Sequence, residues 1–220
     1  STLMLTGVIV LGVAATLLVS RFLSRTILRG LPSSFALELP SYRKPQVCRV
    51  VVRSLFDRTL FVLGRAVMVA APAGLIIWAM ANIHVAGSSL LRIAAGSLDP
   101  FARMIGLDGY ILMAFILGFP ANEIVVPIII MSYTAAGSML ELGSLNALRS
   151  LLVENGWTWL TAVCAILFSL MHWPCGTTCW TIGKETRSAK WTIISFLVPT
   201  LVGIAVCFAV ASAARLLGLV

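Results

Sequence analysis

Two short polar stretches hold the residues best suited to chemistry in this 220-residue sequence, and each contains proline and glycine inside a long apolar run. The first is Leu117-Gly-Phe-Pro-Ala-Asn-Glu-Ile-Val-Val-Pro127. Pro120 lacks an amide hydrogen and disfavours helical backbone at the residue before it, and Gly118 tolerates almost any backbone angle, so we predict a broken helix. With Pro120 as the first residue of a second half-helix, Asn122 and Glu123 fall in its first turn, where the helix dipole favours an anion. Polar oxygens at a helix break inside a membrane are typical of an ion site in a transporter.

Glu123 has a second interpretation that the sequence leaves open. Its carboxylate can instead accept hydrogen bonds from the exposed amides at the broken helix end and never meet a solute. An ionised carboxylate at the bilayer centre costs about 3 kcal/mol or more, so such a group usually faces a cavity or a partner. This cost favours the ion-site interpretation.

The second stretch is Met171-His-Trp-Pro-Cys-Gly-Thr-Thr-Cys179. If a helix restarts at Pro174, Cys175 enters its first turn and Cys179 follows four residues later on the same face. A thiol at a helix N-terminus gains thiolate character. His172 and the two cysteines would then offer nitrogen and sulfur ligands near one point, a set that suits Fe(II), Zn(II) or Cu(I) better than Na⁺ or Mg²⁺.

The spacing of these cysteines is by itself a weak signal. A C-x3-C pair without a second pair is not a zinc finger, and buried cysteine is most often a small apolar filler. The histidine can simply hydrogen-bond a backbone carbonyl freed at the break. The candidate metal ligands are Cys175, Glu123, Asn122, Cys179 and His172, and the candidate hinge residues are Gly118, Pro120, Pro127, Pro174 and Gly176.

Membrane helices must position these stretches, because the sequence is 60% hydrophobic and only 11% charged, with a mean hydropathy of +1.02. One soluble core cannot hide that much apolar surface. We therefore predict an all-α, polytopic helical membrane protein with discontinuous helices. A crossing helix needs about 20 mostly apolar residues. The predicted single membrane domain, residues 1–220, comprises a first span at 1–22, a cytoplasmic interfacial segment at 36–60, a second span with a broken gate helix at 66–131, a broken gate helix at 155–183 and a last span at 191–214.

The basic residues predict the orientation of the chain. Nine of the sixteen lie between Arg21 and Arg65, which puts residues 21–58 in the cytoplasm and the N-terminus outside. The basic run Lys184 to Lys190 favours the cytoplasm as well, whereas simple alternation of five spans would place it outside. A re-entrant segment, which enters and leaves the membrane by the same face, at 109–131 or at the Pro174 turn, removes this conflict.

Other classes of protein fit the sequence poorly. It contains no Gly-x4-Gly-Lys-Ser/Thr phosphate loop and no serine or cysteine nucleophile with a recognisable base beside it, so we expect no enzyme activity. Its basic excess lies beside an apolar span, unlike that of a soluble nucleic-acid binder, so no nucleic-acid partner is expected.

At the two polar stretches the sequence resembles the ferrous iron transport protein B family, specifically the C-terminal part of its membrane domain with the second gate region. The resemblance rests on Glu38-Leu-Pro-Ser-Tyr-Arg-Lys-Pro45, Gly118-Phe-Pro-Ala-Asn-Glu-Ile-Val-Val-Pro127, and His172-Trp-Pro-Cys175 followed by Lys184-Glu-Thr-Arg-Ser-Ala-Lys-Trp191. Three motifs in the same order and spacing are more specific than any one of them, and they cover residue 36 to the C-terminus.

The resemblance implies uptake of Fe(II) through the bacterial inner membrane, with no bound organic cofactor. It places Pro174-Cys175 in a gate that lines the path and matches Asn122 and Glu123 to the other polar break, whereas Cys179 has no counterpart that can be carried over. Full-length members also resemble a small GTPase at their N-terminus and carry a first gate region, and these 220 residues contain neither. We therefore expect a fragment of a longer protein or one subunit of a split transporter, completed by a partner segment or by self-association.

Two alternatives remain at this point. The same gate architecture also resembles nucleoside-recognition membrane proteins, which would move another solute. A structural or regulatory membrane subunit would use the breaks only for packing, with the metal path in a partner. Our hypothesis is that Fe(II) sheds water where the two broken helices meet, with Cys175 as the soft ligand and Glu123 or Asn122 as the hard one.

Overall fold

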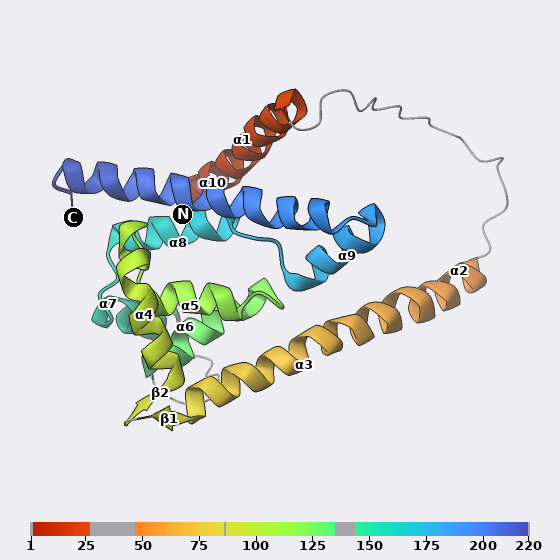
Figure 1. The fold of residues 1–220 in the computed structure, drawn as a ribbon, viewed down its shortest axis with the longest axis horizontal. Coiled ribbons are helices and arrows are strands. Elements are labelled where there is room, and N and C mark those ends of the chain that lie inside the picture. Colours follow the sequence, from red (N-terminus) through yellow and green to blue (C-terminus); the bar gives the residue numbers. More distant parts are fainter. Residues whose placement is uncertain (1, 27–46, 86, 135–143, 220) are drawn as a thin grey trace. The chain divides into compact units, whose positions relative to one another are not determined.

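The computed structural model describes residues 2–26, 47–85, 87–134 and 144–219 (Figure 1). The chain divides into two compact units, Ser1–Ser54 and Leu55–Val220. The first unit contains α1 (Thr2–Thr26) and α2 (Val47–Ser54). Residues 2–22 of the predicted first span lie in α1, and the described part of the predicted interfacial segment begins at α2. The motif Glu38 to Pro45 lies outside the described residues.

The second unit is almost entirely helical, which confirms the predicted all-α class. Its elements are η1, a π-helix (Leu55–Leu60), α3 (Phe61–Asn82), β1 (His84–Val85), β2 (Ser88–Ser89), α4 (Leu90–Met104), α5 (Gly109–Leu117), η2, a 3₁₀ turn (Asn122–Ile124), α6 (Val125–Thr134), α7 (Leu145–Glu154), α8 (Trp159–Met171), α9 (Gly176–Thr186) and α10 (Ala189–Leu216). The two strands pair antiparallel as a small hairpin. The start of the predicted segment 66–131 therefore forms one helix to Asn82 and then a hairpin, because Gly87, with φ 82°, reverses the chain there.

Apolar helices long enough to cross a membrane account for much of the described chain. Three meet that criterion by length and composition: Thr6–Thr26, the broken helix Trp159–Thr186, and Ala189–Leu216. The bent pair α4 and α5, which meet at 108°, adds a fourth if it is counted as one span. Large apolar side chains such as Leu75, Trp78 and Leu201 remain exposed on the helix surfaces, as expected for a chain that lipid covers.

The helices α5 and α6 form a hairpin whose two outer ends lie together. Asp108 caps the start of α5 by accepting a hydrogen bond from the Ile111 amide at 2.7 Å, and it also accepts one from the Tyr133 hydroxyl near the end of α6. The rings of Tyr110 and Tyr133 meet edge to face with centroids 5.6 Å apart. The chain thus runs along α5, turns at the predicted break and returns along α6.

The helix α10 packs along both halves of the other broken helix, α8 and α9 (Figure 1). Close approach is possible because Gly203 has no side chain; an added Cβ would lie 3.0 Å from the Met171 carbonyl oxygen. Deeper in the same interface, the Cys207 thiol donates to the Cys164 carbonyl at 3.5 Å. All five cysteines are free thiols, and these two are buried.

A core of apolar residues fills the space between α4, α5, α6, α8 and α10. Its fully buried large side chains include Ile105, Ile111, Ile128 and Phe168. The rings of Phe115 and Phe168 meet edge to face at 4.9 Å in the centre of this core. The core therefore fixes the hairpin against the second broken helix.

Candidate functional site: the junction of two helix breaks

The first break separates α5 from α6. Gly118 ends α5, and the Ala121 amide donates to the Gly118 carbonyl at 3.0 Å, which closes a turn around Pro120. The second half-helix starts at Asn122 and not at Pro120, because Ala121 is extended, with φ −152° and ψ 114°, and takes the N-cap position. Asn122 and Glu123 do occupy its first turn, and Pro127 lies at the third residue of α6, where a missing amide hydrogen costs little.

Gly118 is essential to the shape of this break. A Cβ at that position would lie 2.4 Å from a methyl group of Val125 and 2.9 Å from the Ala114 carbonyl oxygen. Both distances are shorter than van der Waals contact, so a side chain would push α6 away from α5. The glycine therefore serves close packing here, since its own φ of −73° is one that any residue adopts.

The second break separates α8 from α9. The α8 helix ends at His172, whose amide donates to the Phe168 carbonyl at 2.7 Å. The next helix starts at Gly176, two residues later than we expected, because Cys175 has extended backbone and acts as the N-cap: its carbonyl accepts the Cys179 amide at 3.0 Å. Cys175 therefore lies at the N-terminus of α9, just before its first turn.

The two breaks contact each other directly. The Gly176 amide donates a 2.7 Å hydrogen bond to the Phe119 carbonyl, so an orphan donor at the start of α9 pairs with backbone freed at the first break. The edge of the Phe119 ring would lie 3.2 Å from a Cβ at Gly176, so the two segments are packed closely. Phe196 of α10 lies against both, 5.9 Å from the Phe119 ring and stacked on Trp173 at 5.7 Å.

The predicted ligand residues at the junction differ in how free their donor atoms are. Asn122 Oδ1 and His172 Nε2 are buried and have no hydrogen-bond partner among the described residues. The His172 Nδ1 lies 2.9 Å from the Ser169 carbonyl, so the alternative role as partner of a freed carbonyl is present. A carbonyl only accepts, so Nδ1 carries the proton and Nε2 offers a lone pair, as in histidines that ligate metals.

The sulfur atoms have weaker local partners. Cys175 Sγ lies 3.1 Å from the hydroxyls of both Thr177 and Thr178, and Cys179 donates to the Pro174 carbonyl at 3.5 Å. The two threonines were not among the residues singled out from the sequence, although they follow Cys175 by two and three residues, within one helical turn of the thiol. Their hydroxyls are oxygen donors beside the soft sulfur.

Glu123 is exposed on the tip of the hairpin and makes no hydrogen bond or ion pair with a described residue. Within the described chain, no group of three or more His, Cys, Asp or Glu side chains is arranged to hold a metal ion. The expected convergence of His172, Cys175 and Cys179 on one point is therefore not present. The physical reason is the later helix start: Cys175 caps α9, and the His172 ring turns toward Phe115, 5.1 Å away.

An apolar cavity of about 490 Å³ opens beside the junction. Five aromatic side chains contribute to its wall, namely those of Phe101, Phe119, Phe168, Trp173 and Phe196. Because its lining is almost entirely carbon, the cavity does not itself offer donors for a bare cation.

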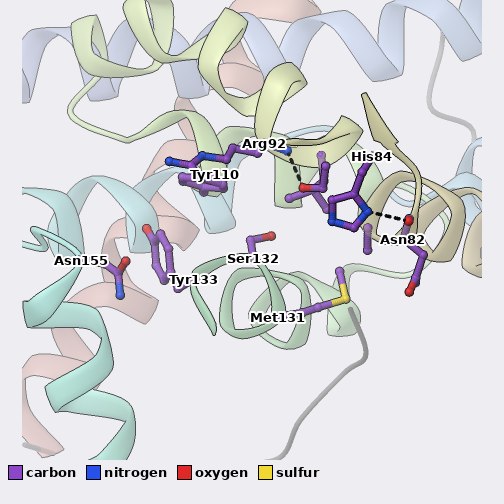
Figure 2. Close-up of a pocket in the computed structure, with 11 residues that line it drawn as sticks. Asn82, His84, Arg92, Tyr110, Met131, Ser132, Tyr133 and Asn155 are labelled. Carbon is purple, nitrogen blue, oxygen red and sulfur yellow. Dashed lines mark hydrogen bonds between the residues drawn. The ribbon is translucent and has the colours of Figure 1, made fainter. Parts of the chain in front are cut away.

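A polar pocket of about 470 Å³ lies at the other end of the hairpin, where α3, the strands and α4 meet α5 and α6 (Figure 2). Arg92, His84 and Tyr110 line it, and His84 Nδ1 donates to the Asn82 carbonyl at 2.9 Å. No carboxylate is among its described lining residues, and the Arg92 guanidinium repels a dication. The junction of the breaks is thus the better candidate for cation chemistry.

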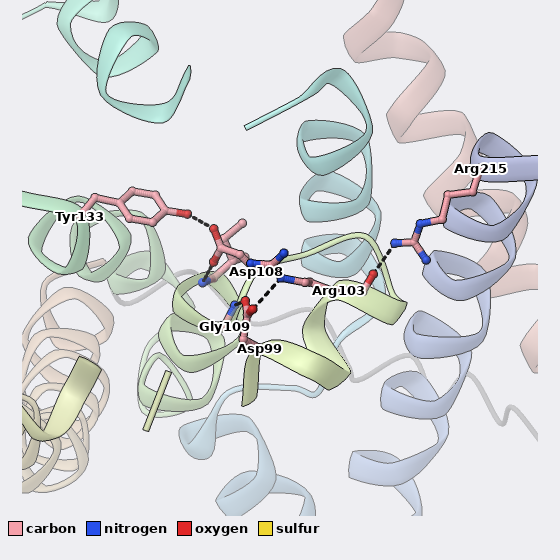
Figure 3. Close-up of polar contacts among 7 residues, drawn as sticks. Asp99, Arg103, Asp108, Gly109, Tyr133 and Arg215 are labelled. Carbon is pink, nitrogen blue, oxygen red and sulfur yellow. Dashed lines mark hydrogen bonds and ion pairs between the residues drawn. The ribbon is translucent and has the colours of Figure 1, made fainter. Parts of the chain in front are cut away.

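A set of hydrogen bonds holds that outer end together (Figure 3). We call the residues Asp108, Tyr133 and Trp157 the clasp: Tyr133 donates to Asp108 and accepts from the Trp157 indole at 2.8 Å. Burial raises the pKa of the Tyr133 hydroxyl above its ordinary value, and the hydrogen bond to Asp108 raises it further. The phenol therefore stays protonated and remains a donor.

Asp99 of α4 reinforces the same end. Its carboxylate accepts from the Gly109 amide at 3.0 Å and from Arg103 Nε at 2.6 Å, and the Arg103 carbonyl in turn accepts from Arg215 of α10 (Figure 3). These contacts hold α4, α5 and α10 together at the start of α5. The break lies at the other end of this nine-residue helix, about 14 Å away.

Two protein-family models match different parts of this chain. The family model described as "Nucleoside recognition" (Gate) matches residues 63–189, which include both breaks. The chain belongs to this gate family. A second model, described as "Ferrous iron transport protein B C terminus", matches residues 5–58.

Full-length relatives carry the name Fe(2+) transporter FeoB. That of Staphylococcus aureus (strain MSSA476) is 26% identical over 205 residues, covering 90% of this chain and 29% of the relative. Those of Campylobacter jejuni and Leptospira interrogans (serovar copenhageni) are 25% identical and cover 87% and 93% of this chain. The gate-family chain thus spans about a third or less of the length of these relatives, matching the C-terminal membrane part of FeoB. No solved structure matches it.

Proposed function

We propose that this gate-family chain is the C-terminal membrane portion of a GTPase-linked Fe(II) uptake system, in which the ion passes the junction of the two helix breaks. The names of the relatives support the substrate, and the two family matches support the membrane role. The observation that carries the proposal is the 2.7 Å hydrogen bond between the Gly176 amide and the Phe119 carbonyl, because it brings the two polar breaks to one place.

The depth of the junction supports a transport role. The nine residues of α5 rise about 14 Å from the outer clasp to the break, which is about half of a 30 Å hydrocarbon core. Broken helices at the membrane midplane expose backbone and side-chain donors that a continuous helix would satisfy internally. An ion at this depth replaces part of its water shell with those donors.

The donor atoms suit a borderline-soft dication. Cys175 supplies sulfur at the positive end of α9, and Asn122 Oδ1 and His172 Nε2 supply buried, unpaired lone pairs from the two breaks. Glu123 and Cys179 complete the proposed set of ligands, and Gly118, Pro120, Pro127, Pro174 and Gly176 act as the hinges that shape it. Transport requires coordination weak enough for release, and no group of three or more described His, Cys, Asp or Glu side chains forms a closed metal cage. Fe(II) is the cargo, and no bound organic cofactor is required.

The exposed Glu123 supports a further partner. A carboxylate that faces lipid at mid-membrane depth is costly, so its side of the hairpin must meet a wet path or another polar segment. The chain spans 29% to 33% of the relatives' length, which leaves room for a first gate region and a GTPase domain, on the same polypeptide or on a separate subunit. We propose that such a segment, or a second copy of the chain, closes the ion path over Glu123.

The hairpin also supports a bacterial inner-membrane topology. If α5 and α6 enter and leave by the outer face, then α8 and α9 cross inward together and α10 crosses outward. The basic turn from Lys184 to Lys190 then lies in the cytoplasm, as the positive-inside rule requires. Cysteine labelling at Ser188 tests this arrangement, and labelling by an impermeant reagent from outside would refute it.

Iron uptake by cells that express the full-length protein with Cys175→Ser tests the function. Replacing a soft sulfur ligand by a hydroxyl should lower Fe(II) uptake by about tenfold or more while the protein still inserts. The matched control is Cys48→Ser, because Cys48 is an exposed thiol in α2 and far along the chain from both breaks. Unchanged uptake in Cys175→Ser would remove Cys175 from the path, and loss in both variants would show a general effect of cysteine removal.

The gate-family description favours one second candidate, transport of a nucleoside-like solute. The aromatic cavity of about 490 Å³ beside the junction has the size and flat walls to stack a base. Uptake of labelled nucleoside that divalent metals do not inhibit would support this candidate. Metal-dependent uptake that nucleosides leave unchanged would refute it, and a chain that moves neither would be a structural or regulatory subunit.

A further inference from the structure

The groove between α9 and α10 has features that neither helix packing nor the ion path uses. It is shallow and wide open, with a volume of about 750 Å³, and is lined on one side by Trp180, Gly183 and Lys184 and on the other by Thr192 and Ile193, with Arg187 at the turn. We propose that this groove binds an anionic phospholipid of the inner leaflet, with its phosphate at the turn and one acyl chain along the groove.

The floor of the groove is made of small side chains. Gly176, Cys179 and Gly183 follow one another at spacings of three and four residues, so they lie on one face of α9. At Gly183 the helices approach closely, since an added Cβ would lie 3.2 Å from the Thr192 hydroxyl. Seven residues of α helix rise about 10 Å, so the groove leads from the turn to the second break.

Both walls of the groove belong to helices that could span a membrane. The α8–α9 helix and α10 are each 28 residues long and apolar enough to cross a membrane, and the groove lies where one ends and the other begins. Trp180 is 49% exposed and Ile193 is 56% exposed, so apolar surface lines the opening. Tryptophan at the end of a span is typical of the level of the lipid headgroups. We therefore expect an acyl chain to occupy the apolar part of the groove next to the turn.

The charge at the turn selects an anionic headgroup. Residues 184–190 contain Lys184, Arg187 and Lys190 against a single acid, Glu185, which gives a net charge of +2. None of the three cations makes an ion pair with a described residue, and Lys184 Nζ lies 5.7 Å from the centre of the Trp180 ring, above its face. Lysine and arginine both bind phosphate, arginine through two parallel N–H donors.

The backbone holds Arg187 in a special position. Its φ of 48° is in the left-handed region, where only glycine is free of strain, and it is the one non-glycine residue of the described chain with positive φ. Arg187 is the C-cap residue of α9 and lies beside the groove. The same geometry supplies a clean test, because glycine at position 187 removes the charge without disturbing the turn.

Fluorescence quenching by brominated lipids measures the proposed binding. The purified full-length protein is placed in neutral detergent micelles and titrated with phosphatidylglycerol whose acyl chains carry bromine. The signal of Trp180 is obtained as the difference from Trp180→Phe. We expect saturable quenching by the anionic lipid and only weak, linear quenching by brominated phosphatidylcholine.

The variant Lys184→Gln with Arg187→Gly should bind phosphatidylglycerol about 25-fold more weakly, since each basic residue near a membrane surface contributes about fivefold. Arg92→Gln is the matched control, because it removes an exposed arginine without a described ion pair at the other end of the unit and should leave binding unchanged. If the double variant fails to accumulate, Arg187→Gly alone carries the test with an expected fivefold loss. Equal quenching by the two lipids in the unaltered protein, or unchanged binding in Arg187→Gly, would overturn the proposal. Displacement of the lipid by millimolar inorganic phosphate would also overturn it, since the site would then take a soluble anion.

Discussion

Replacing Tyr133 by phenylalanine tests whether the clasp closes the α5–α6 hairpin. The change removes one hydroxyl and keeps the ring, so the edge-to-face contact with Tyr110 at 5.6 Å is preserved. Two hydrogen bonds are lost: the one that Tyr133 donates to the Asp108 carboxylate and the one that it accepts from the Trp157 indole at 2.8 Å.

The expected magnitude follows from the partners. A hydrogen bond to a charged group contributes about 1.5 to 3 kcal/mol, and a neutral one contributes about 1 kcal/mol. Asp108 and Trp157 are only half-buried, so water replaces part of what is lost. We therefore expect Tyr133→Phe to lower the free energy of unfolding by about 2 to 3 kcal/mol.

Unfolding by sodium dodecyl sulfate in mixed micelles, followed by circular dichroism, measures this difference. Tyr110→Phe is the matched control, since no described residue hydrogen-bonds its hydroxyl, and it should cost less than about 0.5 kcal/mol. Asp108→Asn keeps a helix cap but weakens the acceptor, so in a double-mutant cycle it should couple to Tyr133→Phe by about 1 kcal/mol or more. A Tyr133→Phe protein as stable as Tyr110→Phe, with no coupling to Asp108, would refute the idea that the clasp holds the hairpin.

Two further predictions concern the same end of the unit. Gly109→Ala should destabilise the protein by about 3 kcal/mol or prevent its accumulation, because the added Cβ would lie 2.0 Å from the Ala95 carbonyl oxygen. The control Gly96→Ala, where nothing lies within 4 Å of the added Cβ, should be neutral or stabilise α4 by about 0.5 to 1 kcal/mol. Equal thermal stability of the two variants would contradict the observed packing. Alkaline pH should also weaken the clasp: the pKa of Tyr133 is raised in the folded state, so its contribution is complete below the ordinary value of 10.0 and declines as the pH rises above it. Between pH 9 and pH 11, the free energy of unfolding should fall more for the unaltered protein than for Tyr133→Phe. Equal falls in the two proteins would argue against a raised pKa of Tyr133.

The positions of both breaks were predictable from residue types, and their details were not. Pro120 with Gly118, and Pro174 with Gly176, act on the backbone of their immediate neighbours, so a break near each is a local consequence. The half-helices nevertheless begin at Asn122 and Gly176, each two residues after the proline. Ala121 and Cys175 take extended N-cap conformations, and each lies close in sequence to one partner of the hydrogen bond that joins the breaks, from the Gly176 amide to the Phe119 carbonyl.

The candidate ligands were likewise predictable only in part. Their residue types indicated metal chemistry, but whether their lone pairs are free depended on distant neighbours. The His172 ring turns toward Phe115, more than fifty positions earlier in the chain, and that leaves Nε2 buried and unpaired. The clasp was missed entirely, because Asp108, Tyr133 and Trp157 are about 25 positions apart and none lies in a recognisable motif.

The amino-acid sequence by itself determined that lipid must cover this chain and where its helices cannot continue, because apolar content and the backbone limits of proline and glycine are local properties. The tertiary structure alone decided which helix ends meet, since helices that are apolar on every side carry no stripe to specify their partners. Close contacts at glycines and a few buried hydrogen bonds make that choice, and they place the two breaks against each other.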